Sequence, residues 1–217
     1  MSMRIISLLI GYGCGLFQTS YIYGRMNGID IREKGSGNAG TTNALRTLGK
    51  KAGIIVMAGD ILKCILAALI VYFLFGRNHP ELDYLLRTWA GLGCILGHNY
   101  PFYMGFRGGK GVACTAGFIN SISWQMTIIG NLLFFVNFFV THYVSLGSLM
   151  VGAMLMIGTV IMGELGMFHL GRAAQIEMYV LVAIITAQMF IRHRENIKGL
   201  LSGTERKTYL SGKGKKK

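Results

Sequence analysis

Long apolar segments constrain this chain more than any other feature. A helix needs about 20 apolar residues to cross a bilayer, and the 217-residue sequence supplies several such runs. The segment 111–122 is too short to cross in the standard way, so it either tilts or joins 124–141 as one long bent helix. We therefore expect an all-α integral membrane protein with about seven transmembrane helices, and fewer if the short segment does not span. The candidate helices lie at about 4–24, 53–75, 84–105, 111–122, 124–141, 146–166 and 174–191.

The composition supports one membrane domain over residues 1–217. Hydrophobic residues make up 52% of the chain and charged residues 14%, whereas a soluble domain carries about a quarter charged residues. A net charge of +13 is common in nucleic-acid-binding proteins, but here the cations lie between or beside apolar runs and not along one soluble face. We expect no nucleic-acid partner. The basic end, 208–217, is predicted to be a solvated tail attracted to anionic headgroups.

The placement of the cations predicts the orientation in the membrane. If the polar stretches at 34–53 and 97–115 share a side with the C-terminus, that side holds seventeen of the 22 Lys and Arg residues. The positive-inside bias makes this side cytoplasmic. An outer N-terminus and a cytoplasmic C-terminus require an odd number of spans, which favours seven.

The first polar stretch, KGSGNAGTTNALRTLGKKAG, has the residues that a phosphate requires. Glycines allow backbone amides to converge on an anion, and hydroxyl and amide side chains such as Ser36, Asn38 and Thr41 add donors. The pattern becomes helical from Thr41, so the loop also lies at a helix N-terminus, where the dipole favours negative charge. Arg46 follows five residues later and can reach the same anion. The alternative is a flexible loop enriched in cations by the positive-inside bias.

The second stretch, GHNYPFYMGFRGGKGVACT, places His98 before a Gly-Gly-Lys-Gly run. It fails the test for a nucleotide-binding Walker loop, which needs glycine where Met104 stands and a hydroxyl residue where Gly111 stands. ATP is therefore not indicated. Lys110 is interpreted as a cation held against a phosphate, and its alternative is a lysine that snorkels to the membrane interface.

The third stretch, RHRENIKGLLSGTERK, offers His193, Asn196 and Glu205. His193 and Asn196 are three residues apart, so they share a helix face and can bind one ligand together. An ordinary surface histidine is the alternative reading. The loop 141–148 either adds a hydroxyl or amide donor or is a plain helix turn.

Three acidic or basic residues occupy costly positions inside apolar helices. Asp60 and Lys63 are three residues apart, and ionisable groups within a membrane usually pair or line a polar cavity. We expect a structural pair that supports the site, with direct catalysis as the alternative. Glu164 has no obvious partner.

The sequence contains no evident protein nucleophile. There is no Gly-x-Ser-x-Gly elbow, no evident Cys/His pair and no His-x4-Asp arrangement. Metal-ligand spacing is also missing, and the four cysteines form no C-x-x-C pair. A reaction that needs neither a protein nucleophile nor a metal, such as transfer from an already activated donor, fits best.

The three stretches together resemble the signature motifs of the bacterial acyl-phosphate:glycerol-3-phosphate acyltransferases of the PlsY type. The motifs occur in the family's order, and the apolar segments between them match its layout over nearly the whole chain. This resemblance implies a multi-pass inner-membrane enzyme with seven helices and cytoplasmic Gly-rich loops that form the active site. Its substrates would be acyl phosphate and glycerol 3-phosphate, and its products lysophosphatidic acid and phosphate.

The resemblance also assigns roles to residues of this chain. We expect a functional monomer with no cofactor and no metal. The catalytic residues would be Ser36, Arg46, Lys110, His193 and Asn196. The substrate-binding residues would be Gly37, Asn38, Gly40, Thr41, His98, Gly108, Gly109 and Glu205.

Two other classes of protein remain compatible with these features. One is a small transporter for a phosphorylated anion, with Asp60 and Lys63 lining its path; the other is a binding or assembly protein. A transporter needs polar groups along the whole crossing, whereas nearly all of the candidate ligands here gather on one side. The sequence therefore favours acyl transfer.

Overall fold

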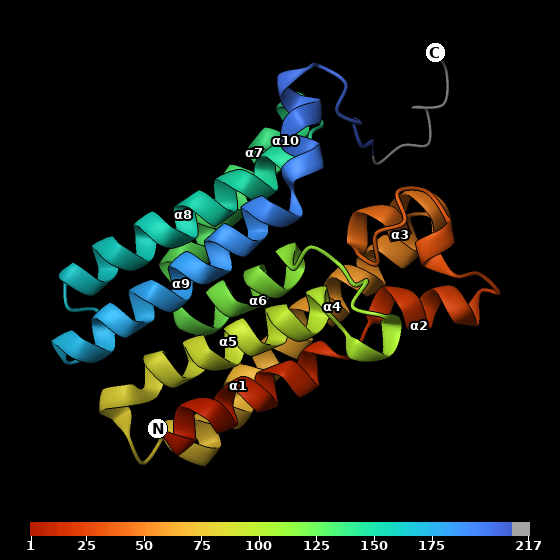
Figure 1. The fold of residues 1–217 in the computed structure, drawn as a ribbon. Coiled ribbons are helices and arrows are strands. Elements are labelled where there is room, and N and C mark those ends of the chain that lie inside the picture. Colours follow the sequence, from red (N-terminus) through yellow and green to blue (C-terminus); the bar gives the residue numbers. More distant parts are fainter. Residues whose placement is uncertain (210–217) are drawn as a thin grey trace.

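The computed structural model of this chain describes residues 1–209 and is a bundle of helices without a strand in that range (Figure 1). Most of the predicted tail, 210–217, lies outside the described residues. The α-helices are α1 (Ser2–Gly15), α2 (Thr19–Met26), α3 (Thr41–Leu48), α4 (Lys50–Val71), α5 (Asp83–Asn99), α6 (Val112–Ile122), α7 (Trp124–Thr141), α8 (Val144–Glu164), α9 (Arg172–Arg192) and α10 (Arg194–Leu201).

Five helical segments within residues 1–209 are long and apolar enough to cross a membrane. Helix α5 has 17 residues and so rises about 26 Å, close to the thickness of a hydrocarbon core. Helix α6 has 11 residues and rises only about 16 Å. An all-helical membrane fold is confirmed, while the number of seven spans stays a prediction. The five segments are Ser2–Met26, Lys50–Gly76, Trp124–Thr141, Val144–Glu164 and Arg172–Arg192.

Two expected helices end earlier than predicted. The helix expected at 84–105 stops at Asn99, because the residue before Pro101 is disfavoured in a helical conformation. The helix expected at 4–24 is broken between α1 and α2, where Gln18 leaves the helical region. The Gln18 side-chain amide donates to the carbonyl oxygens of Gly15 and Gly97, so tertiary contacts stabilise the break.

Glycines bring α1 and α5 into close contact. Gly11 and Gly15 of α1, and Gly93 and Gly97 of α5, each follow the small-xxx-small spacing. A Cβ on Gly15 would lie 2.3 Å from a backbone oxygen of α5, and one on Gly93 would lie 2.1 Å from a backbone oxygen of α1. Only glycine lets the two backbones approach this closely.

The short helix α6 lies near the centre of the bundle, where it packs against α4, α5 and α7 (Figure 1). Its Phe118 is fully buried in the main apolar core with Leu85 of α5 and Leu155 of α8. Large apolar side chains elsewhere, such as Leu66 and Leu132, are exposed, as lipid-facing residues would be.

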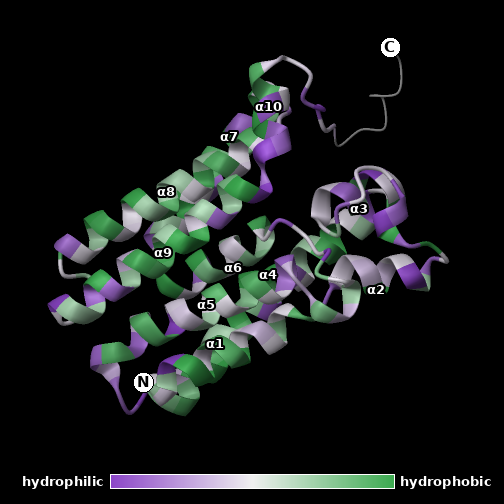
Figure 2. Cartoon of the chain, viewed as in Figure 1, coloured by the Kyte–Doolittle hydropathy of each residue, from purple (hydrophilic) through white to green (hydrophobic). Residues whose placement is uncertain are grey.

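Hydrophilic segments gather at one end of the bundle (Figure 2). Helices α2, α3 and α10 lie at that end with the loop between α5 and α6, while the N-terminus lies at the opposite end (Figure 1). The three polar stretches therefore share one end of the molecule, as the sequence predicted.

Candidate active site

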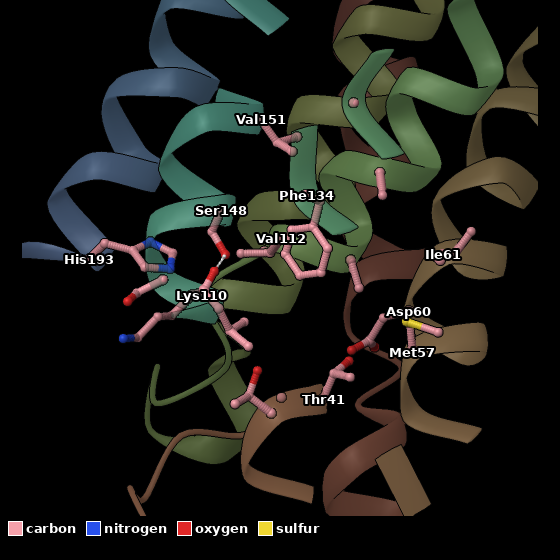
Figure 3. Close-up of a pocket in the computed structure, with 18 of the residues that line it drawn as sticks. Thr41, Met57, Asp60, Ile61, Lys110, Val112, Phe134, Ser148, Val151 and His193 are labelled. Atoms are coloured by element: carbon pink, nitrogen blue, oxygen red, sulfur yellow. Dashed lines mark hydrogen bonds between the residues drawn. The ribbon is translucent and has the colours of Figure 1, made fainter. Parts of the chain in front are cut away.

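A cavity of about 230 Å³ lies at the polar end, and it brings together ten of the thirteen predicted site residues. Figure 3 shows its two sides: Thr41 and Asp60 come from α3 and α4, and Ser148 and His193 face them from α8 and the end of α9. The ten are Ser36, Asn38, Gly40, Thr41, Arg46, His98, Lys110, His193, Asn196 and Glu205.

The wall nearer the bundle interior is mostly apolar, although Asn120, Thr127 and Asn131 also belong to the lining. Met57 of α4, Val112 of α6, Phe134 of α7 and Val151 of α8 line it (Figure 3). The lining continues to Phe135, whose side chain is exposed on the outside of α7. The same cavity thus joins a cationic end to an apolar groove.

Asn43 folds the first polar stretch into its loop. Its side-chain amide donates to the carbonyl oxygens of Ile31 and Lys34, both at 3.0 Å, and its Oδ1 accepts from the Ser36 amide at 2.9 Å. Gly35 has a positive φ of 64°, and a Cβ there would lie 2.2 Å from Asn43 Oδ1. Asn43 is a residue that the sequence interpretation did not assign, although its position inside the motif was a signal.

The loop leads directly into the N-terminus of α3 at the cavity wall. The first backbone bond of this helix joins Ala44 N to Gly40 O at 3.0 Å, so the preceding amides of the helix have no helical partner. The buried Thr41 hydroxyl also has no hydrogen-bond partner among residues 1–209. These unpaired donors form a site suited to an anion.

Three predicted contacts do not line the cavity. The amide of Gly37 donates to Lys34 O, and those of Gly108 and Gly109 donate to the carbonyl oxygens of Asn99 and His98. These amides close their own loops in the structure, and the predicted contacts of the three glycines with substrate stay a prediction. Gly108 must also be small, since a Cβ there would lie 2.0 Å from His98 O.

Lys110 belongs to a hydrogen-bonded chain across the cavity. Its ammonium donates to Asn196 Oδ1, and the Asn196 amide donates to Glu205 Oε1 at 2.7 Å. Ser145 of α8 donates to the same Glu205 oxygen at 2.6 Å. Burial lowers the pKa of Lys110, and the charge of Glu205 opposes that shift. Glu205 therefore holds Ser145 and Asn196 in place in addition to lining the cavity.

Residues 204–208 form a C-terminal strap that crosses from the α7–α8 turn to α3. The Thr208 amide donates to His142 O at 2.9 Å. Arg46 of α3 donates to Arg206 O at 3.1 Å and to the Thr208 hydroxyl at 2.5 Å. The strap thus links the two sides of the cavity through the arginine that we predicted to bind an anion.

The ring of His193 has a defined tautomer. Its Nδ1 lies 2.8 Å from Met189 O, and a carbonyl can only accept, so Nδ1 carries the hydrogen and Nε2 carries the lone pair. Burial lowers the pKa of His193 to about 4, and the nearby cations Lys110 and Arg192 add to the effect. His193 is therefore neutral at physiological pH.

Arg192 is a structural residue that the sequence did not single out. Its guanidinium donates to the carbonyl oxygens of Gly108 and Gly109, at 3.2 and 2.7 Å, and lies over the Tyr100 ring. Arg192 therefore fixes the loop that carries Lys110. A cation beside the motif histidine was a signal, but its two partners in the loop are 83 and 84 residues away in the chain.

The predicted Asp60–Lys63 pair is confirmed, with 2.9 Å between Lys63 Nζ and Asp60 Oδ1. Asp60, His98 and Cys114 have potential metal-ligand atoms within 4.8 Å of one another. The Lys63 ammonium already lies among them, 2.9 Å from His98 Nδ1, so a second cation would be repelled. The expectation that Glu164 lacks a partner was wrong, because Arg172 forms an ion pair with it at 2.7 Å.

The fold is that of a helical integral membrane protein, and its cavity joins cationic and hydroxyl side chains at one end to apolar side chains at the other. The chain belongs to the glycerol-3-phosphate acyltransferase family, because the family model of that description matches residues 5–203. It is thus an acyltransferase of phospholipid synthesis, and the resemblance seen in the sequence is confirmed.

Relatives of this family are similar along almost the whole chain. The glycerol-3-phosphate acyltransferase of Clostridioides difficile (strain 630) is 39% identical over 206 residues, which cover 94% of each chain. That of Shouchella clausii (strain KSM-K16) is 38% identical and covers 94% of this chain and 95% of the relative. The crystal structure of PlsY, an integral membrane glycerol 3-phosphate acyltransferase, in its glycerol 3-phosphate form superposes with a TM-score of 0.80 and 32% identity. The alignment covers 95% of this chain and 96% of that one. The lysophosphatidic acid form gives a TM-score of 0.78.

Proposed function

We propose that this protein transfers a fatty acyl group from acyl phosphate to the sn-1 hydroxyl of glycerol 3-phosphate, releasing lysophosphatidic acid and phosphate. The reaction takes place at the cytoplasmic face of the bacterial inner membrane, in a monomer and without a cofactor. The PlsY structures in glycerol 3-phosphate and lysophosphatidic acid forms support the acceptor and the product by analogy.

The proposal rests on one observation: the cavity described above has a polar, cationic end and a mostly apolar wall. Its polar end holds Arg46 and Lys110 with the unpaired amides of α3, which suits two phosphate groups. Its other wall is mostly apolar and reaches the outside of the bundle beside Phe135. An acyl phosphate needs both environments at once, since its tail belongs in the lipid and its headgroup at the polar end.

The cavity residues suggest a division of labour. Lys110 and Arg46 bind the phosphate of glycerol 3-phosphate. Ser36 and the first amides of α3 bind the acyl phosphate and stabilise the negative charge that grows on the leaving phosphate. His193 and Asn196 orient the acceptor.

The proton balance requires no protein base. A bond forms between the glycerol oxygen and the acyl carbon, the bond from that carbon to the phosphate oxygen breaks, and the hydroxyl proton goes to the departing phosphate. This scheme assigns no proton transfer to His193, whose burial lowers its pKa to about 4.

The test is product formation by the purified protein with palmitoyl phosphate and glycerol 3-phosphate, with no added metal, coenzyme A or carrier protein. We expect stoichiometric phosphate and 1-acyl-glycerol 3-phosphate, identified by mass spectrometry and NMR. Turnover only with an acyl thioester would overturn the donor assignment. If the folded protein turned over neither palmitoyl phosphate nor an acyl thioester, the result would favour the transporter hypothesis.

A further inference from the structure

A buried polar cluster lies below the cavity, among α1, α4 and α5. It consists of Asp60 and Lys63 of α4 and His98 of α5, whose side chains are 2%, 5% and 4% exposed. Charged groups inside a membrane protein are costly, so their arrangement calls for a function beyond packing. His98 and Asp60 also line the cavity, whereas Lys63 does not.

The Lys63 ammonium lies within hydrogen-bonding distance of four partners, of which Gly15 O is the most distant at 3.4 Å. Its Nζ lies 2.9 Å from Asp60 Oδ1, 2.8 Å from Phe17 O and 2.9 Å from His98 Nδ1. An ammonium group can donate but cannot accept. His98 Nδ1 must therefore be the acceptor, and it cannot carry a hydrogen.

The same contact decides where the ring hydrogen lies. Asp60 balances the charge of Lys63, and an N–H on Nδ1 would point at the ammonium 2.9 Å away. A neutral imidazole with an unprotonated Nδ1 carries its hydrogen on Nε2. The pair thus selects one of the two tautomers.

The selected tautomer leaves a donor beside the Gly-Gly-Lys loop. His98 Nε2 forms no hydrogen bond with any residue between 1 and 209, and it lies so close to Gly109 that a Cβ there would be 2.0 Å away. The absence of a side chain at position 109 therefore keeps the Nε2 hydrogen accessible from the cavity that His98 lines.

We propose that Lys63 is a positioning residue that fixes the Nε2–H tautomer of His98, so that His98 donates a hydrogen bond to a substrate phosphate oxygen, while Asp60 neutralises and orients Lys63. This inference rests on the proposed function for the identity of the phosphate. The tautomer itself is a property of the protein without substrate.

The first experiment is NMR of the full chain in lipid or detergent with ¹⁵N-labelled histidine at neutral pH. Comparison with His98→Gln identifies the His98 signals. We expect Nδ1 of His98 at the shift of an unprotonated nitrogen and Nε2 at that of a protonated one. In Lys63→Met the two shifts should move toward an average of both tautomers. A hydrogen on Nδ1 of the wild type overturns the proposal, as does an unchanged tautomer in Lys63→Met.

Arg4→Met is the matched control, because it also removes the cation of an ion pair within the helical bundle. Arg4 of α1 binds Glu177 of α9, with 2.6 Å between Arg4 Nε and Glu177 Oε1, near the N-terminal end of the bundle. We expect this change to leave the His98 signals as in the wild type. If Lys63→Met does not yield folded protein, the wild-type tautomer still decides the proposal.

Kinetics supply the second readout. Lys63→Met and His98→Leu should each lower kcat/KM by roughly 10- to 100-fold, the usual effect of losing one hydrogen bond to a charged group. The double variant should lose no more than the single ones, since both changes remove the same donor. Additive losses would contradict the proposal. An inactive wild type with the expected tautomer would refute the proposed function and leave the tautomer assignment intact.

Discussion

At the residue scale, Lys110 and Arg46 are two of the three Lys and Arg residues that line the cavity, and the third is Arg206 of the strap. Lys110 lies in the loop before α6, and Arg46 lies on α3. Arg107 belongs to the same loop as Lys110 but is exposed and does not line the cavity. Lys110 and Arg107 are three residues apart, but only Lys110 lines the cavity.

Replacement of either cavity cation should impair the use of glycerol 3-phosphate. We expect Lys110→Ala and Arg46→Ala to lower kcat/KM for this substrate by about 100-fold or more, because each removes a charge-assisted contact to phosphate. Steady-state kinetics of the purified variants measures the effect. Arg107→Ala is the control and should stay within a few-fold of the wild type. Wild-type kinetics in both cavity variants would refute the assigned roles.

His193 should make stability depend on pH. Its folded pKa of about 4 lies below the ordinary value of 6.5, so between these values the unfolded chain binds the proton more readily. The free energy of unfolding should fall by up to roughly 3 kcal/mol as the pH drops through this window. Apparent melting temperatures in detergent should show a smaller drop in His193→Asn. An identical pH profile in wild type and variant would exclude this role, and His79→Asn, at an exposed residue, is the control.

At the element scale, the contact of α1 with α5 depends on one face of α1. Gly15 faces α5, whereas a Cβ on Gly13 would meet nothing within 4 Å. We expect Gly15→Ala to destabilise the protein by about 1–3 kcal/mol, because a backbone must move to admit the methyl group. Gly13→Ala should be neutral or slightly stabilising, because alanine favours a helix. Thermal unfolding in detergent compares the two, and equal melting temperatures would count against the close approach.

We expect Glu205 to fix the C-terminal strap to α8 and α10 through its contacts with Ser145 and Asn196. In Glu205→Ala, Ser145 and Asn196 lose their shared acceptor, so the strap should detach and Lys110 should lose its orienting partner. We expect faster trypsin cleavage after Arg206, followed by mass spectrometry, and a roughly 10-fold lower kcat/KM. Glu195→Ala, an exposed change on α10, is the control. Unchanged cleavage in Glu205→Ala would show that other contacts hold the strap.

At the scale of the whole molecule, the polar and N-terminal ends should face opposite sides of the membrane. Cysteines introduced at Ser202, after α10, and at Asn78, in the turn before α5, lie at positions exposed in the structure. A membrane-impermeant thiol reagent added to intact cells should label Asn78→Cys and not Ser202→Cys. The reverse pattern would invert the proposed orientation. The native cysteines are buried or half-buried, which keeps background labelling low.

Some structural elements could be predicted from the sequence, and others could not. The apolar lengths predicted α7, α8 and α9 closely, because a membrane span is a local property of composition. The break between α1 and α2 contains no proline, so it could not be found without knowing that Gln18 and Lys63 bond to the freed carbonyl groups. The partners of the Gly108 and Gly109 amides could not be predicted for a related reason, since they are carbonyl oxygens of α5.

The sequence by itself determined that this is a helical membrane protein with its polar motifs on one side, and that those motifs match an acyltransferase family. These properties depend on composition, spacing and residue identity, which a linear chain displays directly. The tertiary structure alone decided which motif residues reach the cavity, which serve to close loops, and which hydrogens the two buried histidines carry. Those outcomes depend on contacts between segments far apart in the chain, such as Lys63 with His98 and Lys110 with Asn196.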